Sequence, residues 1–256
     1  MEISPINPFD DLFEEEEYVL LKNYLYNYLL RKRAVEKNIM VKNPGLILEV
    51  GSDLSPMITS TNSIVYSDMS FSALQILRRR HGKGFYMVAD GMHLPFKSNV
   101  FDQIICSEVL EHLIDDRLAL EEMSRVMKLS SQLILTFPHR KVYFAYDDRF
   151  VNHLRRYELI EMTDRLKAVG LSSLYIQKVL GPLEKVTMCL VLFCFSLVQK
   201  YKTTKQSKAG QTRIMQSLTL IFRWVNLFYV GLVWLDAKIM PRSLATVLLI
   251  KAEREP

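Results

Sequence analysis

The sequence predicts an α/β domain built on a mostly parallel β-sheet. Short apolar runs alternate with helical segments about every 20 to 30 residues, which is the rhythm of strand, crossover and strand units. Three early runs carry an acid at their carboxyl end, namely Glu49, Asp68 and Asp90. Ligands of parallel sheets sit outside the carboxyl ends of the strands. The sequence therefore predicts a binding site at this edge of the sheet.

Composition is that of one globular domain. The chain has 256 residues, of which 49% are hydrophobic and 24% charged, enough for a sizeable core. We expect a single domain over 1–256, with a helical arm or lid at 1–42 and an apolar helical insert at 181–242. The acidic beginning of the chain does not resemble a signal peptide. The net charge of +5 is compatible with an anionic lipid, a phosphorylated substrate or neither.

The three cysteines lie in apolar runs, without the paired Cys or His spacing of a metal site. We therefore expect no metal site and no disulfide framework, and a reducing cytoplasm as the compartment.

Helix signals separate the expected strands. Ser70 can cap a helix over 71–80, and Asp115 or Asp116 can start another that ends near Met127. Pro56 favours a short helix over 57–61. A long amphipathic helix follows the capping box of Asp11 and Glu14 and runs to Lys37, and a further helix covers 157–169. The seven expected strands are 46–50, 64–67, 85–89, 101–106, 132–137, 171–180 and 244–251, and we expect those at 85–89 and 101–106 to be buried.

The strand-end acids suit a cofactor that contains a nucleoside. Asp68 lies about 20 residues beyond the first strand end, where dinucleotide folds place the acid that binds the ribose. Asp90 can accept a hydrogen bond from an exocyclic amine such as that of adenine, and Gly51 lets a ligand approach the backbone. The alternative is that these acids only cap helices and turns.

The stretch 88–112 carries the most specific pattern. It contains Ala89-Asp90, Leu94-Pro95-Phe96, Phe101-Asp102 and Leu110-Glu111-His112. In order and spacing this pattern resembles the class I S-adenosylmethionine-dependent methyltransferases, small-molecule (type 11-like) branch, and the resemblance covers residues 45 to about 180. It implies a Rossmann-like seven-stranded sheet with flanking helices, an antiparallel last strand and the apolar insert between strands six and seven. It also implies an enzyme that transfers a methyl group from S-adenosyl-L-methionine.

The resemblance also implies roles for single residues. Glu49 and Gly51 would flank the methionine part of the cofactor, and Asp68 would hold the ribose hydroxyls. Asp90 would face the adenine amine. Other cofactor contacts expected from the resemblance are Met69, Gly91, Met92, Ser107 and Glu108, whereas Glu111 and His112 are expected to be structural.

The first loop departs from the family pattern, which is glycine-rich. Only Gly51 is kept, while Asp53 and Ser55 occupy later glycine positions. This departure leaves open the alternative of a non-catalytic, methyltransferase-like adaptor at a membrane surface. An NAD-dependent oxidoreductase is disfavoured, because the loop also lacks the GxGxxG pattern.

The loop after strand five carries the candidate acceptor contacts. His153 is the expected general base for a hydroxyl acceptor, whereas a carboxylate acceptor needs none. The alternative is a loop histidine bonded to backbone. The arginines suggest an anionic acceptor. The expected substrate contacts are His139, Tyr143, Tyr146, Arg155 and Arg156.

The insert suggests a membrane surface. The apolar run 186–198 is shorter than the roughly 20 residues needed to span a bilayer, and polar residues interrupt the run 214–235. With the basic linker 200–208, the segment 183–240 is expected to lie on anionic lipid as a peripheral hairpin on the cytoplasmic face. Its alternatives are a helical cap, a homodimer interface or a true span. We expect a small-molecule or lipid-linked acceptor, and no nucleic acid.

Overall fold

The computed structural model describes residues 25–39, 45–189 and 226–255. The expected capping box of Asp11 and Glu14, the first half of the long helix and the basic linker 200–208 lie outside these residues.

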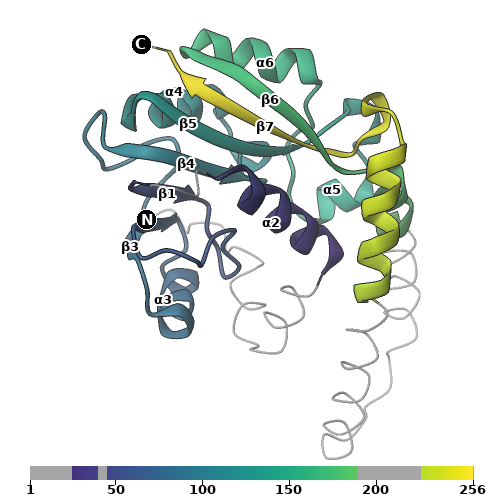
Figure 1. Ribbon diagram of the computed structural model, residues 1–256, viewed down its shortest axis with the longest axis horizontal. Helices are drawn as coiled ribbons and strands as arrows, with labels where there is room; N and C mark the ends of the chain where they lie inside the picture. Colours follow the sequence, from purple (N-terminus) through teal and green to yellow (C-terminus); the bar gives the residue numbers. More distant parts are fainter. Residues whose placement is uncertain (1–24, 40–44, 190–225, 256) are drawn as a thin grey trace, which may run out of the picture.

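A seven-stranded sheet forms the centre of the molecule, in the order β3-β2-β1-β4-β5-β7-β6 (Figure 1). The strands from β1 to β5 pair in parallel, and β7 is antiparallel to both of its neighbours, β5 and β6. The predicted fold class is confirmed. The strands are β1 (Ile47–Val50), β2 (Ile64–Asp68), β3 (Phe85–Val88), β4 (Phe101–Ser107), β5 (Met127–Pro138), β6 (Leu171–Leu180) and β7 (Val247–Arg254).

The strand register brings the carboxyl ends of β1, β2 and β4 to one edge. Val50 pairs with Ser67 on one side and with Cys106 on the other. The next residues along the three strands are Gly51, Asp68 and Ser107. Since β1 is the strand from which the chain winds outward in both directions, this edge is the topological switch point at which ligands of such sheets bind.

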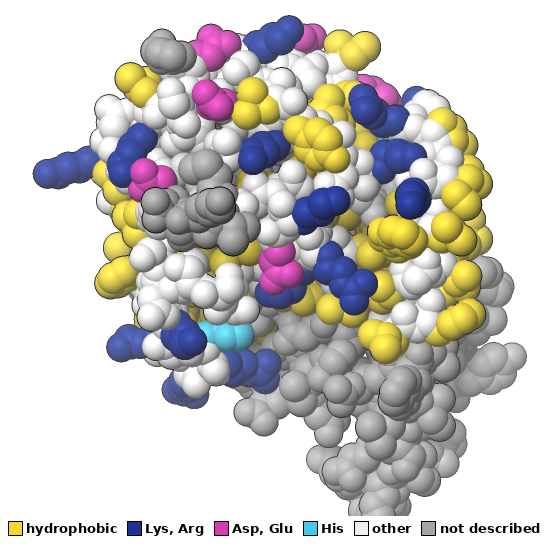
Figure 2. Space-filling model, in the orientation of Figure 1, with side chains coloured by type: hydrophobic (Ala, Val, Ile, Leu, Met, Phe, Trp, Pro, Cys, Tyr) yellow, Lys and Arg dark blue, Asp and Glu magenta, His cyan; other side chains and the backbone are white. Residues whose placement is uncertain are grey.

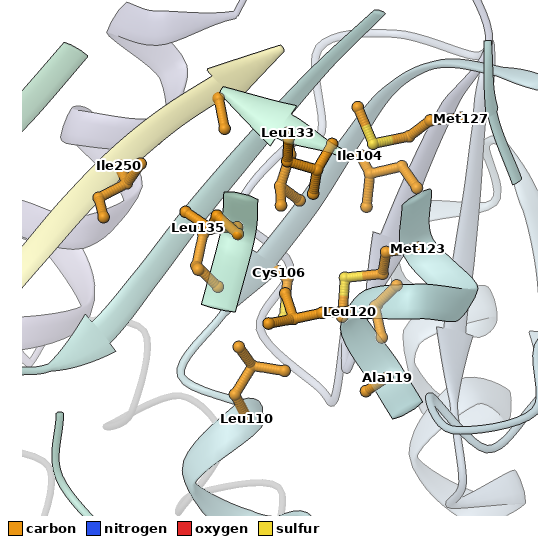
Figure 3. Packing of buried hydrophobic residues seen from close by; sticks show 14 of the residues in the cluster. Ile104, Cys106, Leu110, Ala119, Leu120, Met123, Met127, Leu133, Leu135 and Ile250 are labelled. Carbon is orange, nitrogen blue, oxygen red and sulfur yellow. The ribbon is translucent and has the colours of Figure 1, made fainter. Parts of the chain in front are cut away.

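Helices cover both faces of the sheet. α4 (Asp116–Val126) and α6 (Leu159–Ala168) share one core cluster, whereas α2 (Tyr26–Asn38) and α3 (Phe71–His81) pack on the other face. Figure 3 shows the first cluster, in which Ile104 and Cys106 of β4 lie beside Leu120 and Met123 of α4. These side chains alternate along β4 with residues that face the other layer, as the strand period of two requires.

Two of the helix starts predicted from the sequence, at Ser70 and Asp115, are confirmed. The Ser70 hydroxyl accepts a hydrogen bond from the Ala73 amide at 3.2 Å, and the Asp115 carboxylate accepts one from the Leu118 amide at 3.0 Å. Each bond satisfies an amide that the first turn of a helix leaves without a partner.

The expectation that 85–89 is a buried strand was wrong. β3 is the last strand at its end of the sheet, so only β2 pairs with it. Phe85 is 64% exposed and Val88 47% exposed. An apolar run of this length cannot distinguish a central strand from an edge strand, because both have the same local composition.

Three other expectations of the sequence need correction. Residues 57–61 form a loop instead of a short helix, because a buried carboxylate binds the Met57 and Ile58 amides. β5 begins at Met127, where it pairs with Phe101, five residues earlier than expected. β7 begins at Val247, because Arg242–Leu244 form a 3₁₀ turn.

The loop after β3 is fastened to α4 by two charged side chains. The Glu122 carboxylate accepts from the Leu94 amide at 2.8 Å. The Arg125 guanidinium donates to the carbonyl oxygens of Leu94 and Phe96 at 3.0 and 2.8 Å, and it also pairs with Glu122 at 2.6 Å. Two residues of the stretch 88–112 are therefore held in place by the helix that follows it.

The described parts of the insert are two helical segments, 182–189 and 226–239. Val230 and Val233 are buried against the molecule, whereas Phe228 and Trp234 are 73% and 52% exposed. Figure 2 shows hydrophobic side chains gathered at the side where Figure 1 draws the second segment. Within the described residues, no helix combines the length and apolar character needed to cross a bilayer.

Replacing Arg125 by alanine is expected to lower the free energy of unfolding by about 1–3 kcal/mol, because two carbonyl oxygens and Glu122 lose their donor. Arg117→Ala is the matched control on the same helix, since Arg117 is exposed and pairs only with Glu121 among the described residues. Arg117→Ala should change the free energy of unfolding by no more than about 0.5 kcal/mol. Urea unfolding measures both, and equal losses would contradict the role of Arg125.

Candidate active site

The loop after β1 is organised by the carboxylate of Glu49. This side chain is buried, and it accepts hydrogen bonds from the Met57 amide at 2.6 Å and the Ile58 amide at 3.4 Å. Burial raises the pKa of Glu49 to about 7, while the two amides and the charge of Lys32 act in the opposite direction. The carboxylate therefore bridges the start of the loop and its end.

The helix α2 holds the same loop from outside. The Tyr28 hydroxyl donates to the Pro56 carbonyl at 2.9 Å, and the Lys32 ammonium donates to the same oxygen at 3.0 Å. On the other side, the Tyr66 hydroxyl of β2 donates to the Ile58 carbonyl at 2.7 Å. Tyr28 thus contacts the loop itself.

Gly51 is required by the chain itself. Its φ is +70°, and a Cβ at this position would lie 2.4 Å from a methyl group of Val109. Asp53, at a glycine position of the family pattern, takes a left-handed φ of 47°. This conformation is unfavourable for a side chain other than glycine, although Asp and Asn tolerate it best.

The predicted cofactor acids both hold turns of the backbone. Asp68 accepts from the Asp53 amide at 2.8 Å and from the Ser70 amide at 2.9 Å, so it links the first loop to α3. Asp90 accepts from the Met92 amide at 2.9 Å. Each carboxylate has up to four lone-pair sites, so holding a turn leaves capacity for a ligand.

Buried polar atoms gather at this edge. The hydroxyls of Ser52 and Ser55 and the Oε1 atom of Glu108 are buried, and none has a hydrogen-bond partner among the described residues. Glu108 takes a left-handed φ of 55°, and Ser107 is held by the Thr136 hydroxyl at 2.8 Å. Orphaned polar atoms and strained backbone in one place are typical of a ligand site.

His153 lies at the centre of a buried ionic network. Its Nδ1 atom is 3.0 Å from the Asp148 carboxylate, and the same carboxylate pairs with Arg156 and Lys185 at 2.7 Å each. Burial raises the pKa of Asp148, but the hydrogen bonds of His153 and Lys185 and the charge of Arg156 together hold it well below its usual range. A carboxylate that stays charged fixes the ring of His153.

Glu111 lies on the other side of His153. Its carboxylate is fully buried, neither oxygen has a hydrogen-bond partner among the described residues, and Oε1 is 3.7 Å from the His153 Nε2 atom. Burial and then the charge of Glu108 raise the pKa of Glu111 well above its usual range. The expectation that Glu111 only braces the loop does not account for these two oxygens.

The remaining predicted acceptor contacts occupy different environments. His139 is buried, its Nδ1 atom lies 2.9 Å from the Ala245 carbonyl, and burial lowers its pKa. Arg156 is buried beside Asp148, and Arg155 pairs with Asp116 at 3.2 Å. Tyr146 is 66% exposed at the start of the short helix α5 (Tyr146–Phe150). Tyr143 is half-buried. Met69, predicted as a cofactor contact, is exposed.

Sequence reasoning missed two residues of the network. Asp148 is the fixed partner of His153, and Lys185 reaches Asp147 and Asp148 from the insert. The proximity of Asp148 and His153 in the chain was the available signal. Nothing in the sequence indicated that a lysine from an otherwise apolar segment would be buried against two carboxylates.

Comparisons with known proteins agree with this architecture. Residues 49–135 match the family model described as "Methyltransferase domain". A demethylmenaquinone methyltransferase of Streptomyces griseus is 28% identical over 128 residues, which are 46% of this chain and 56% of that protein. The chain spans less than two thirds of the length of three curated relatives that it matches.

Solved structures show the same fold. A chain of the complex between the Haloferax volcanii Trm112 methyltransferase activator and a methyltransferase aligns with a TM-score of 0.64 and 13% identity, covering 99% of this chain and 100% of that one. A phosphoethanolamine N-methyltransferase of Haemonchus contortus, solved with S-adenosyl-L-methionine, aligns with a TM-score of 0.60 and 14% identity. The alignment covers 100% of this chain and 62% of that one. The resemblance to the class I fold is confirmed, and these comparisons support the predicted cofactor.

Glu49→Gln is expected to change how stability depends on pH. The folded chain favours the protonated acid, so the stability due to Glu49 is full below its ordinary pKa of 4.5 and is lost as the pH rises through about 7. Relative to wild type, the glutamine variant should gain about 3 kcal/mol between pH 4.5 and 7.5. Urea unfolding at a series of pH values measures this gain. A constant difference between the two proteins would contradict the raised pKa.

Proposed function

We propose that this chain, whose residues 49–135 form a methyltransferase domain of the class I fold, transfers a methyl group from S-adenosyl-L-methionine to a small-molecule or lipid-linked acceptor. The observation that carries the proposal is the register of the sheet. It brings Gly51, Asp68 and Ser107 to one edge, beside buried polar atoms that have no partner among the described residues.

Different residues of the chain would contact the ribose, the adenine and the methionine end of this cofactor. Asp68 would bind the ribose hydroxyls, and Asp90 would bind the adenine amine with Gly91, Met92 and Met69 near the ring. Glu49 and Gly51 would flank the methionine end, where the Ser52 and Ser55 hydroxyls supply donors in place of glycine amides. Ser107 and Glu108 would close the floor of the pocket. When bound, the cofactor supplies a methyl group on a sulfonium, which leaves as a neutral thioether.

The acceptor would enter between this floor and the loop after β5. If the hydrogen on Nδ1 is donated to Asp148, the Nε2 atom of His153, 3.7 Å from Glu111, would be the atom that takes the proton of a hydroxyl acceptor. Tyr143 and Tyr146 offer the more accessible contacts. Arg155, Arg156 and His139 would shape the loop through the partners described above. A carboxylate acceptor would need alignment only.

A lipid-like acceptor at a membrane surface is the substrate class we favour. The relative from Streptomyces griseus is named for a menaquinone precursor, which is an apolar acceptor. The segment 226–239 exposes Phe228, Trp234 and Ile239, the last by 68%, as a peripheral membrane helix would. With this helix on a membrane, the chain would act on the cytoplasmic face. A homodimer interface on the same helix is the alternative.

A non-catalytic adaptor is the second candidate function. Asp53 and Ser55 stand at family glycine positions, and Asp53 adopts a left-handed backbone despite its side chain. If the methionine end cannot enter, the sheet and the helix 226–239 could still serve as a surface for a membrane or partner. Binding of the demethylated cofactor separates the two functions.

Two substitutions should separate binding from turnover. Asp68→Asn is expected to weaken S-adenosylhomocysteine binding at least tenfold, because a charged acceptor is lost. His153→Ala should keep that affinity but lower methyl transfer to a short-chain prenylated hydroquinone by about 10²–10⁴. Calorimetry and release of S-adenosylhomocysteine measure the two effects. Asp164→Ala and His81→Ala, at exposed positions, are the matched controls. Wild-type turnover in His153→Ala would remove this residue from the role.

Binding to vesicles tests the membrane proposal. The full chain should co-sediment with vesicles that contain phosphatidylglycerol, and Phe228→Glu with Trp234→Glu should reduce the bound fraction at least tenfold, because apolar burial drives interfacial binding. Ile160→Glu is the matched control, since Ile160 is an exposed apolar residue of α6. Failure of the wild type to bind, with a stable dimer by light scattering that the double variant disrupts, would favour the interface.

A further inference from the structure

We propose that Glu111, His112 and His153 bind a divalent transition-metal ion beside the acceptor site. One ligand atom from each of the three side chains lies within 4.8 Å of the other two, the described residues being those searched. No metal site was expected from the sequence, because its cysteines lack the spacing of metal ligands. His153 also lies far along the chain from Glu111 and His112. The fold brings the three together.

Glu111 is the first observation that points to a cation. Its side chain is fully buried, and both carboxylate oxygens are without a hydrogen-bond partner in the described part of the chain. The distance of 3.7 Å from Oε1 to the His153 Nε2 atom is too long for a hydrogen bond. It suits two ligands of one ion, because adjacent ligands at bond lengths of about 2.1 Å stand about 3–3.5 Å apart.

His153 is held in the manner of a metal ligand. Its Nδ1 atom lies 3.0 Å from Asp148, which Arg156 and Lys185 keep charged and in place. A carboxylate on one ring nitrogen fixes the tautomer and orients the other nitrogen as the ligand, as in the carboxylate, histidine and metal arrangement common in metal sites. The Nε2 atom of His153 is the one directed at Glu111.

His112 supplies the accessible side of the cluster. Its ring contacts that of His153, with centroids 4.8 Å apart, and its Nδ1 atom lies 3.3 Å from the Asn152 carbonyl. The residue is exposed, so an ion can enter from solvent. Among the described residues three side chains form the cluster, which leaves coordination positions for water or for an oxygen of the acceptor.

The ligand types select the class of ion. Two imidazoles and one carboxylate suit Zn²⁺, Mn²⁺ and Fe²⁺, whereas Mg²⁺ prefers a shell of oxygens. Glu108, with a buried Oε1 atom and a charge that acts on Glu111, adds negative potential nearby. The Glu111 oxygens would then have the partner that the described protein groups do not give them.

The metal site refines the proposed function and rests on it for its role. An ion on the Nε2 atom of His153 excludes that atom as a proton acceptor. The ion would instead bind the acceptor oxygen and lower the pKa of its hydroxyl, so that the proton passes to bulk water. His153 is needed both as a general base and as a metal ligand, so loss of turnover in His153→Ala does not distinguish these two roles. Metal binding measured apart from turnover does.

The experiment is titration of the full, metal-stripped chain with MnCl₂, ZnCl₂ and MgCl₂, followed by calorimetry and, for Mn²⁺, by electron paramagnetic resonance. We expect one ion per chain, with affinity at least tenfold lower in Glu111→Gln and in His112→Asn. Glu121→Gln and His81→Asn, at exposed positions, should bind as the wild type does. Because His112 is exposed, His112→Asn decides the outcome if Glu111→Gln fails to fold.

Three results would overturn the metal site. These are absence of binding to the wild type, binding that survives both cluster variants, and Mg²⁺ affinity equal to that for Mn²⁺. S-adenosylhomocysteine affinity is measured on the same samples. Retained affinity without metal binding overturns the metal site alone, whereas absent affinity overturns the proposed function whatever the metal result.

Discussion

The structure depends on two carboxylates that hold the loop after β1. Glu49 binds the amides of Met57 and Ile58, and Asp68 binds the amide of Asp53. In a glycine-rich loop the chain takes its shape because glycine allows it. Here side chains occupy two of those positions, and the carboxylates below the loop impose the shape instead. The loop is thereby kept at the switch point of the sheet although its sequence has changed.

A second constraint is the buried ionic network around His153. Asp147 and Asp148 of α5 are buried, and Lys185 reaches both from the start of the insert. Removing one member of such a network would leave a buried charge without its partner, which costs far more than an exposed pair contributes. The insert is therefore more than a surface attachment, because its first helical turns complete the environment of His153.

Much of the fold could be predicted from local sequence. Ser70 and Asp115 were recognisable as helix caps, because these signals act within a few residues. The acids near the ends of the strands predicted the edge at which we propose that the cofactor binds. The exposure of β3 could not be predicted, since it depends on which strand lies next to it. The same holds for Glu111, which motif spacing suggested to be structural. Its unpartnered oxygens and its distance from His153 appear only when β4 and the loop after β5 are brought together.

The central claim is that carboxylates replace glycines and leave the first loop able to receive the methionine end of the cofactor. A crystal structure of the full chain with S-adenosylhomocysteine tests it most directly. The account predicts the ribose on Asp68 and the methionine end against Gly51, Ser52 and Ser55, with Asp53 still bound to Asp68. A complex in which the loop has moved away from Glu49, or in which the methionine end lies outside the loop, would contradict the account.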